Sequence, residues 1–232
     1  MIIISKYKNA FKIFKNGKHL LFSYNLSEYD FIVSKICAGI SKKDINFYQI
    51  DKFYIAELVN LKDIFTVKVG AVSGNDKIFT NDEYGNADFV NSTTAKTDKT
   101  RKMIFNINIP YLEEYKDVLM ARRIRKFSEN DWWQWGRLHH ISEQKRIYVN
   151  CKTRNKKPFF VHKCKNYDGS VLALFPNEQS LNENELCEKL NNVNWYELGF
   201  VCDGRYIFSQ KSLENTLLPD TFLKYINKNE IF

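Results

Sequence analysis

The sequence of 232 residues lacks several features that would place it in common classes. It has no Cys-x-x-Cys pair, and its five cysteines are odd in number and widely spaced. Neither a disulfide framework nor a zinc knuckle is therefore indicated, and we expect reduced thiols in a cytoplasmic protein. No apolar run reaches 18 residues, and the run at residues 2–4 is too short for a signal peptide. We expect no membrane span and no export.

Glycine and proline are also scarce, at nine and four residues, which argues against a long flexible linker. The hydrophobic fraction of 44% and the aromatic fraction of 15% indicate a folded chain with a buried core. The net charge of +8 is unevenly distributed. Residues 96–165 carry 18 basic and 7 acidic side chains, whereas residues 166–232 carry 5 basic and 10 acidic ones. Such asymmetry indicates a directed electrostatic surface.

Residues 122–157 combine this excess of cations with aromatic side chains. Three of the four tryptophans fall within residues 132–135, and arginines and lysines lie on both sides of them. Cations neutralise phosphates and flat rings stack on bases, so the combination suits nucleic acid. The alternative is a cluster of core tryptophans beside a solvated basic face.

The pattern of short apolar runs and turns predicts an α+β fold, with mixed or mainly antiparallel sheets and a few short helices. An N-terminal hairpin with its turn at residues 16–18 is expected from the Asn-Gly pair. Strands are expected at residues 103–109, 146–149, 158–162, 171–175 and 206–208. Helices are expected at residues 27–39, 111–125, 183–190 and 221–232.

Two glycines, Gly70 and Gly74, interrupt a β-branched run and allow two interpretations. They could form a tight loop whose backbone amides approach a ligand such as a phosphate. The more common interpretation of such a spacing is a β-bulge followed by a turn.

Several stretches together resemble the C-terminal target-recognition region of gamma-class adenine-specific DNA methyltransferases of type II restriction–modification systems. They include Asp131-Trp132-Trp133-Gln134-Trp135-Gly136-Arg137 and Tyr167-Asp168-Gly169-Ser170. The stretches that carry the resemblance are residues 61–79, 89–92, 99–104, 111–122, 131–137, 157–162, 167–176 and 198–205. The resemblance implies a DNA target-recognition domain at residues 61–232. It also implies a lead-in region at residues 1–60 that resembles the end of a catalytic domain plus a linker.

The motifs for methyl transfer are missing from the sequence. It has no Gly-x-Gly loop for S-adenosylmethionine and no Pro-Pro loop for a flipped adenine. Asn108-Ile109-Pro110-Tyr111 imitates the second motif but lacks one proline. We therefore expect no catalytic residues and no cofactor or metal in this chain. S-adenosylmethionine is implied only for a catalytic partner or a missing domain.

The resemblance and the charges together predict a surface for double-stranded DNA. Cations on loops would contact phosphates, and polar side chains would read bases. Trp132 is included as an aromatic contact, although at least one of the tryptophans is expected in the core. The expected phosphate contacts are Lys96, Lys99, Arg101, Lys102, Lys152, Lys156 and Lys157. The expected base-reading residues are Ser73, Asn75, Lys77, Gln134, Arg137 and Arg154.

Two other functions remain open from the sequence. Asp131, Glu143 and Lys145 imitate the carboxylate pattern by which many nucleases hold Mg²⁺, so a Mg-dependent DNA nuclease is one alternative. The other is a non-enzymatic protein-binding module whose basic face meets an acidic partner.

Overall fold

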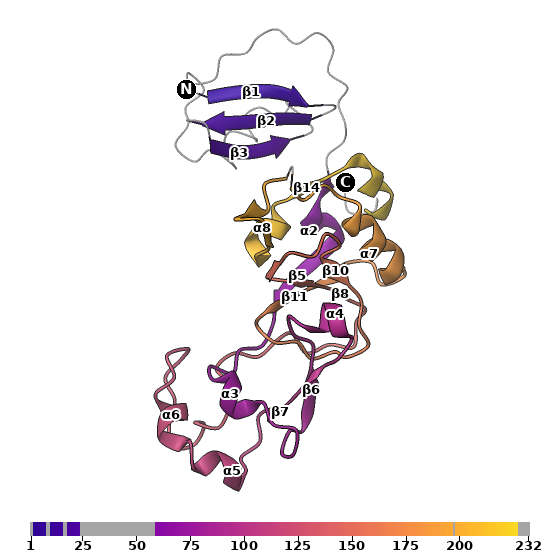
Figure 1. Cartoon of the computed structure of the whole chain (residues 1–232). Coiled ribbons are helices and arrows are strands. Elements are labelled where there is room, and N and C mark those ends of the chain that lie inside the picture. The colour runs from indigo at the N-terminus through magenta and orange to yellow at the C-terminus, as the bar shows by residue number, and fades with distance from the viewer. Residues whose placement is uncertain (1, 8–9, 16–17, 24–58, 197, 227–232) are drawn as a thin grey trace.

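The computed structural model describes residues 2–7, 10–15, 18–23, 59–196 and 198–226 (Figure 1). It has an α+β fold of antiparallel sheets and short helices, as predicted. The N-terminal strands β1 (Ile2–Tyr7), β2 (Ala10–Lys15) and β3 (Lys18–Ser23) pair in antiparallel order, and the pairing of β2 with β3 confirms the two strands of the expected hairpin. The Asn16-Gly17 turn and the helix expected at residues 27–39 lie outside the described residues. No helix among the described residues is long and apolar enough to cross a membrane.

A four-stranded antiparallel sheet of order β10-β8-β11-β5 forms the centre of one lobe. Its strands are β5 (Phe65–Val69), β8 (Ile147–Asn150), β10 (Phe159–Phe160) and β11 (Val171–Pro176). All six residues of β11 are buried, because it lies between two strands and side chains cover both of its faces. The strands predicted around residues 146–149, 158–162 and 171–175 are confirmed.

Short elements from residues 59–64 and from the C-terminal part of the described chain surround this sheet (Figure 1). Trp195, Leu213 and Phe222 belong to the same apolar core as β5 and β8. The predicted helix at residues 183–190 is confirmed as α7, and Asn182 caps it by accepting from the amides of Asn184 and Glu185. The surrounding elements are β4 (Val59–Asn60), α2 (Leu61–Ile64), β9 (Lys152–Thr153), α7 (Glu183–Asn191), β12 (Val201–Cys202), β13 (Arg205–Ile207), α8 (Gln210–Glu214), β14 (Leu217–Leu218) and the 3-10 helix η2 (Asp220–Tyr225).

Of the two elements predicted near the C-terminus, the strand is found and the α-helix is not. The expected strand at residues 206–208 is found as β13, shifted by one residue. The tail helix expected at residues 221–232 is instead the 3-10 helix η2, and residues 227–232 lie outside the described residues. We define the sheet lobe as residues 59–72, 138–196 and 198–226. β4 pairs with β14, and Val59 belongs to the core of this lobe.

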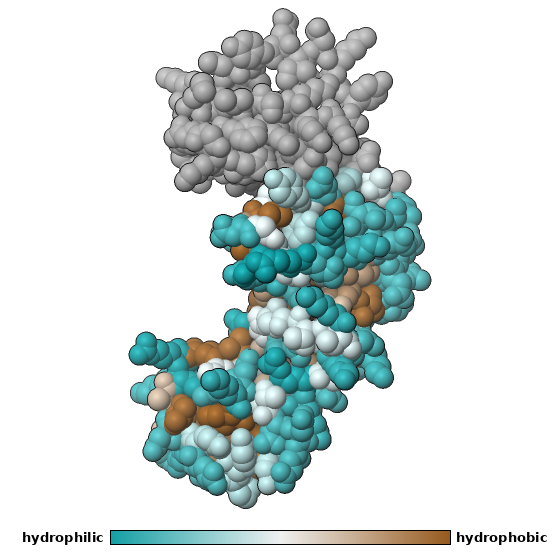
Figure 2. Space-filling view, in the orientation of Figure 1, coloured by the Kyte–Doolittle hydropathy of each residue, from teal (hydrophilic) through white to brown (hydrophobic). Residues whose placement is uncertain are grey.

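Residues 73–137 form a second lobe, the loop lobe, around its own apolar cluster. Phe79, Phe89, Met103 and Trp135 are fully or almost fully buried there, and the Phe89 and Trp135 rings stack with centroids 4.7 Å apart. The elements of the loop lobe are α3 (Asp76–Phe79), β6 (Ala87–Phe89), α4 (Thr94–Thr97), β7 (Arg101–Met103), α5 (Pro110–Glu113) and α6 (Lys116–Met120). In Figure 2, apolar side chains gather on the lobe that carries α5 and α6.

The helix predicted at residues 111–125 is wrong in its extent, because two short helices, α5 and α6, replace it and neither reaches Arg122. The strand predicted at residues 103–109 ends at Met103. Asn106 has a φ of 51°, which interrupts an extended strand, and its side-chain oxygen accepts from the amide of Trp135 at 2.9 Å. In both segments, contacts with the tryptophan-rich stretch replace regular structure.

The two lobes meet where the chain crosses between them twice. Val72 pairs with Arg137, and Ala71 pairs with Asp168 as an isolated bridge. A Cβ atom on Gly70 would lie 1.9 Å from the carbonyl oxygen of Asp168. Gly70 is therefore required for the close approach of two backbones, and the space beside it holds protein rather than a ligand. The phosphate-loop interpretation of this glycine is not supported.

His139 lies between the lobes in an aromatic pocket. Its side chain is 5% exposed and its ring contacts Phe89, Phe105 and Tyr167. Burial, and after it the nearby positive charge of Arg146, lowers the pKa of His139 to about 4. The folded chain thus favours the neutral imidazole, whereas the unfolded chain takes up a proton near pH 6.5.

Stability should therefore fall as the pH drops from about 6.5 to about 4, by up to about 3 kcal/mol. Urea unfolding of the chain across this range measures the effect. His139→Phe removes the titrating group, so its unfolding free energy should fall less over this window. His140→Gln, at the exposed neighbouring position, should behave like the wild type. Equal slopes for all three proteins would contradict this prediction.

Candidate nucleic-acid interface

One buried arginine joins the segments that carry most of the predicted base-reading residues. Arg122 is 8% exposed and donates through Nε to the carbonyl of Leu119 at 2.6 Å. Its Nη1 donates to the carbonyl of Ser73 at 2.5 Å. Its Nη2 donates to the carbonyls of Trp132 and Gln134 at 2.5 and 2.9 Å. Three loops are thus tied to a single guanidinium group.

The charge of Arg122 is maintained despite its burial. Desolvation lowers the pKa of Arg122 to about 10, and repulsion from Arg125 contributes to the shift. The group remains protonated at neutral pH, and all four carbonyls therefore receive charge-assisted bonds. The guanidinium also lies 3.9 Å from the ring centroid of Phe127 and 5.3 Å from that of Phe79. The sequence placed Arg122 near the end of the helix expected at residues 111–125 and at the start of the basic stretch, and did not predict its burial.

Ile124 fixes the same three loops from the outer side. A Cβ atom on Gly74, which has a φ of 85°, would lie 2.7 Å from Ile124 Cδ1. A Cβ atom on Gly136 would lie 2.6 Å from Ile124 Cγ2. Both glycines therefore make room for this isoleucine. We call the exposed and half-buried side chains of residues 73–77, 122–126 and 134–137 the three-loop surface.

The three-loop surface brings together four of the predicted residues. Lys77 and Arg137 are exposed, and Asn75 and Gln134 are half-buried. It also contains two exposed cations, Arg123 and Lys126, that the sequence pattern did not assign to a contact. Their place in the basic run at residues 122–126 was the available signal, and the expected helix obscured it.

Two predicted contacts are corrected by burial. Ser73 is fully buried, and its hydroxyl donates to Asp76 and accepts from the amide of Asn75. Trp132 is 2% exposed and belongs to the core of the loop lobe. Solvent does not reach either side chain, so neither can contact a duplex in this conformation. The expectation that at least one tryptophan is core is confirmed by Trp132 and Trp135. Residues 129–133 form turns.

The Asp131 side chain makes contacts within its own loop. Its carboxylate accepts from the amide and hydroxyl of Ser128 at 2.6 and 2.8 Å and forms an ion pair with Arg125. These contacts, that with Arg125 first, lower the pKa of Asp131 to about 2. Lys145, a second member of the predicted nuclease set, pairs with Glu183 at 3.5 Å. Both groups are therefore engaged in structural contacts, which weakens the nuclease alternative.

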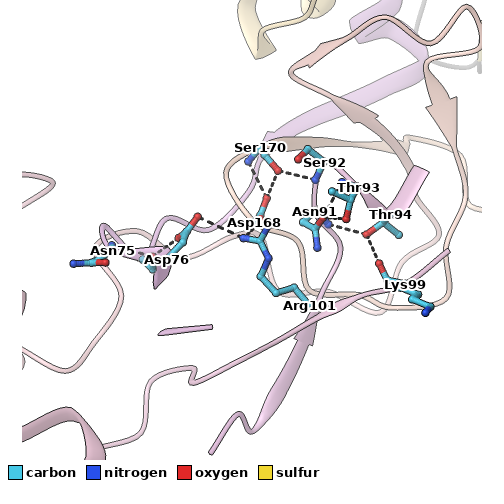
Figure 3. Close-up of polar contacts among 11 residues, drawn as sticks. Asn75, Asp76, Asn91, Ser92, Thr93, Thr94, Lys99, Arg101, Asp168 and Ser170 are labelled. Atoms are coloured by element: carbon cyan, nitrogen blue, oxygen red, sulfur yellow. Dashed lines mark hydrogen bonds and ion pairs between the residues drawn. The ribbon is translucent and has the colours of Figure 1, made fainter. Parts of the chain in front are cut away.

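Lys96 and Lys99 are exposed on the loop around α4, which lies beside the sheet lobe (Figure 1). The Asn91 side chain accepts from the amide and hydroxyl of Thr93, and the Thr94 hydroxyl donates to the carbonyl of Lys99 at 2.8 Å (Figure 3). These local bonds hold the loop so that both lysines face solvent. Lys102, also exposed, donates to the carbonyl of Asp82 at 2.9 Å.

Arg101 is less free for a phosphate than predicted. Its Nη1 lies 3.7 Å from a carboxylate oxygen of Asp76 and 3.7 Å from one of Asp168 (Figure 3). The side chain of Asp168 is 5% exposed and accepts from Ser170, whose hydroxyl in turn accepts from the amide of Ser92 at 2.9 Å. Burial raises the pKa of Asp168, and the bonds from Ser170 oppose that shift. Arg101 thus joins the α4 loop to the three-loop surface.

The remaining predicted cations lie between β8 and β10. Lys152, Arg154, Lys156 and Lys157 are all exposed. The segment between the strands predicted at residues 146–149 and 158–162 is not a simple hairpin turn, because Lys152 is in β9 and faces Ile207 of β13 across a separate small sheet. After β9 the turn is held by side chain to backbone bonds, including one from the Lys157 amide to the Asn155 side chain at 3.1 Å.

The segment that imitates a methyltransferase motif begins a helix. Pro110 occupies the first turn of α5, and the Tyr111 ring stacks on Tyr84 with centroids 5.3 Å apart. Tyr111 therefore already has an aromatic partner at the position where the motif would stack on adenine.

The structure thus brings Asn75, Lys77, Gln134 and Arg137 together and presents two further groups of cations, at residues 96–102 and 152–157. Comparison of this chain with protein-family models and with curated proteins finds no match.

Proposed function

We propose that this chain is the sequence-specific DNA recognition module of a restriction–modification adenine-specific DNA methyltransferase. The observation that carries the proposal is the convergence of three loops on Arg122, which fixes amide and cationic side chains on one surface. Base readout requires such rigid placement, because a bidentate contact tolerates little error in position.

The chemistry of the three-loop surface supports readout of base edges. Arginine and lysine suit guanine, and asparagine and glutamine suit adenine. The Gln134 side-chain oxygen lies 3.4 Å from Nη2 of Arg125, so its amide nitrogen is the freer group. Lys77, Arg123 and Arg137 supply exposed charges around it.

The other exposed cations support contacts with the phosphate backbone. Figure 2 shows the described surface hollowed between the two lobes, with hydrophilic side chains on both sides of the hollow. Lysines on a loop neutralise phosphates and release counterions without reading sequence. We assign this role to Lys96, Lys99, Lys102, Lys152, Lys156 and Lys157. Arg154, exposed on the same turn as Lys156, stays a proposed base contact.

Methyl transfer itself would come from a SAM-dependent catalytic domain or subunit not contained in this chain. By binding the recognition site, the module would position the target adenine at the active site of that domain. This would take place in the cytoplasm, where the cell's DNA lies. Its partners would therefore be double-stranded DNA and the catalytic domain. Mixed with duplex and S-adenosylmethionine alone, this chain is not expected to methylate.

Fluorescence anisotropy with random and selected duplexes at several salt concentrations tests the proposal. Affinity should fall steeply with salt, and Lys156→Ala with Lys157→Ala should reduce the slope of log K against log salt by about 0.9 for each phosphate that is no longer neutralised. The reduction should be similar for all sequences, because these residues are assigned to phosphates. Lys211→Ala, an exposed lysine on α8, is the matched control and should leave the slope unchanged. Binding that is insensitive to salt, or equal for all duplexes, would contradict the proposed function.

A further inference from the structure

One exposed aliphatic side chain lies within the three-loop surface. Ile124 is 40% exposed, and its chain neighbours Arg123 and Arg125 are cationic. Exposed Lys126 and Arg137 lie in the same surface. The surrounding cations make no favourable apolar contact with this side chain. A DNA duplex would offer phosphates to the cations and an apolar group to Ile124.

The packing of the Ile124 side chain limits which groups on a ligand it can contact. Its Cδ1 and Cγ2 atoms lie only 2.7 and 2.6 Å from where Cβ atoms of Gly74 and Gly136 would be, so both branches of the side chain pack against the two glycines. The side chain is therefore held against the surface and does not project from it. Insertion between base pairs requires a wedge that projects from the surface. A braced side chain with one exposed face suits contact with a small apolar group at a groove edge.

The 5-methyl group of thymine is the apolar group that the major groove presents. Amide and cationic side chains for the neighbouring hydrogen-bonding edges are present in the same surface, on Asn75, Gln134 and Arg137. We propose that Ile124 is a specificity-determining residue that contacts the methyl group of one thymine in the recognition site. This inference rests on the proposed DNA-recognition function and adds a base identity to it.

The test combines a change in the protein with a change in the DNA. A preferred duplex is first selected from a random pool with the full chain, and each thymine in it is then replaced singly by uracil. At one position, removal of the methyl group should weaken wild-type binding about fourfold, the effect of one methyl group leaving an apolar contact. Ile124→Ala should bind the thymine duplex more weakly and should not distinguish thymine from uracil there.

Val118→Ala is the matched control, since Val118 is a 52% exposed aliphatic residue on α6 of the same lobe. It should keep the fourfold preference. Ile124→Val retains most of the packing on the glycines and should keep a reduced preference for thymine over uracil. This variant tests the inference if Ile124→Ala does not fold.

The outcomes separate the two proposals. Specific binding by the wild type with no thymine sensitive to its methyl group would overturn the inference and leave the proposed function intact. 2-Aminopurine placed in the duplex becomes more fluorescent when its base is unstacked. A rise in this fluorescence on binding that Ile124→Ala abolishes would show that Ile124 inserts between base pairs, and would also overturn the inferred methyl contact. Absence of salt-dependent, sequence-dependent binding would overturn the proposed function and the inference with it.

Discussion

Arg122→Ala is expected to lower the free energy of unfolding by about 3 to 5 kcal/mol. The substitution removes the donors for four carbonyl groups at once, those of Leu119, Ser73, Trp132 and Gln134. Buried carbonyls without donors are costly, and the cavity beside Phe79 and Phe127 adds to that cost. The loop lobe should therefore lose its fixed arrangement even where the sheet lobe persists.

Urea unfolding monitored by tryptophan fluorescence measures this effect, because Trp132 and Trp135 are buried in the affected cluster. Arg122→Lys should recover only part of the stability, since an ammonium group cannot reproduce a planar fork of donors. Arg123→Ala, at the exposed adjacent position, should change stability by less than about 0.5 kcal/mol. An Arg122→Ala protein as stable as Arg123→Ala would show that the guanidinium does not hold the loops.

Gly70→Ala is expected to destabilise the chain by about 3 kcal/mol or more. The new Cβ atom would lie 1.9 Å from the carbonyl oxygen and 2.3 Å from the carbonyl carbon of Asp168. Backbone atoms cannot rotate away as a side chain can, so β5 and the turn at Asp168 must separate. That separation would disturb the bridge between Ala71 and Asp168, which lies in the sheet lobe next to the crossing at Val72.

Gly204→Ala provides the comparison for Gly70→Ala. Gly204 has a φ of 68° and no atom within 4 Å of an added Cβ, so its substitution tests backbone strain without a clash. Its cost should be about 1 to 2 kcal/mol. Thermal or urea unfolding of the two variants under the same conditions separates the two causes. A Gly70→Ala protein no less stable than Gly204→Ala would contradict the close approach of the two backbones.

The sheet lobe was predictable because its signals are local. β11 is a continuous apolar run ended by Pro176, and α7 begins at Asn182, a strong capping residue. The antiparallel β8 and β10 could also be anticipated from two apolar runs separated by a basic turn. Each of these elements is specified by residues within a few positions of one another.

The loop lobe was not predictable in the same way, because distant contacts decide its structure. Arg122 is 49 residues from Ser73 in sequence, and this bond takes precedence over the helix that the local pattern predicts. The burial of Ser73 and Trp132 likewise depends on how three loops pack together. Composition could identify cations that remain exposed, such as Lys156. It could not identify Arg101 as a residue held between two carboxylates.

For the proposed DNA-recognition function, the bridge between Val72 and Arg137 has a consequence for how a target preference would diversify. The chain enters and leaves the loop lobe at adjacent points, and the lobe contains its own apolar cluster. A segment whose ends meet can be exchanged as a unit without lengthening the chain around it. Recombination between related genes at these two crossings would transfer a complete set of loops together with the arginine that holds them. Single substitutions on the surface would then adjust a preference, and exchange of the whole segment would replace it.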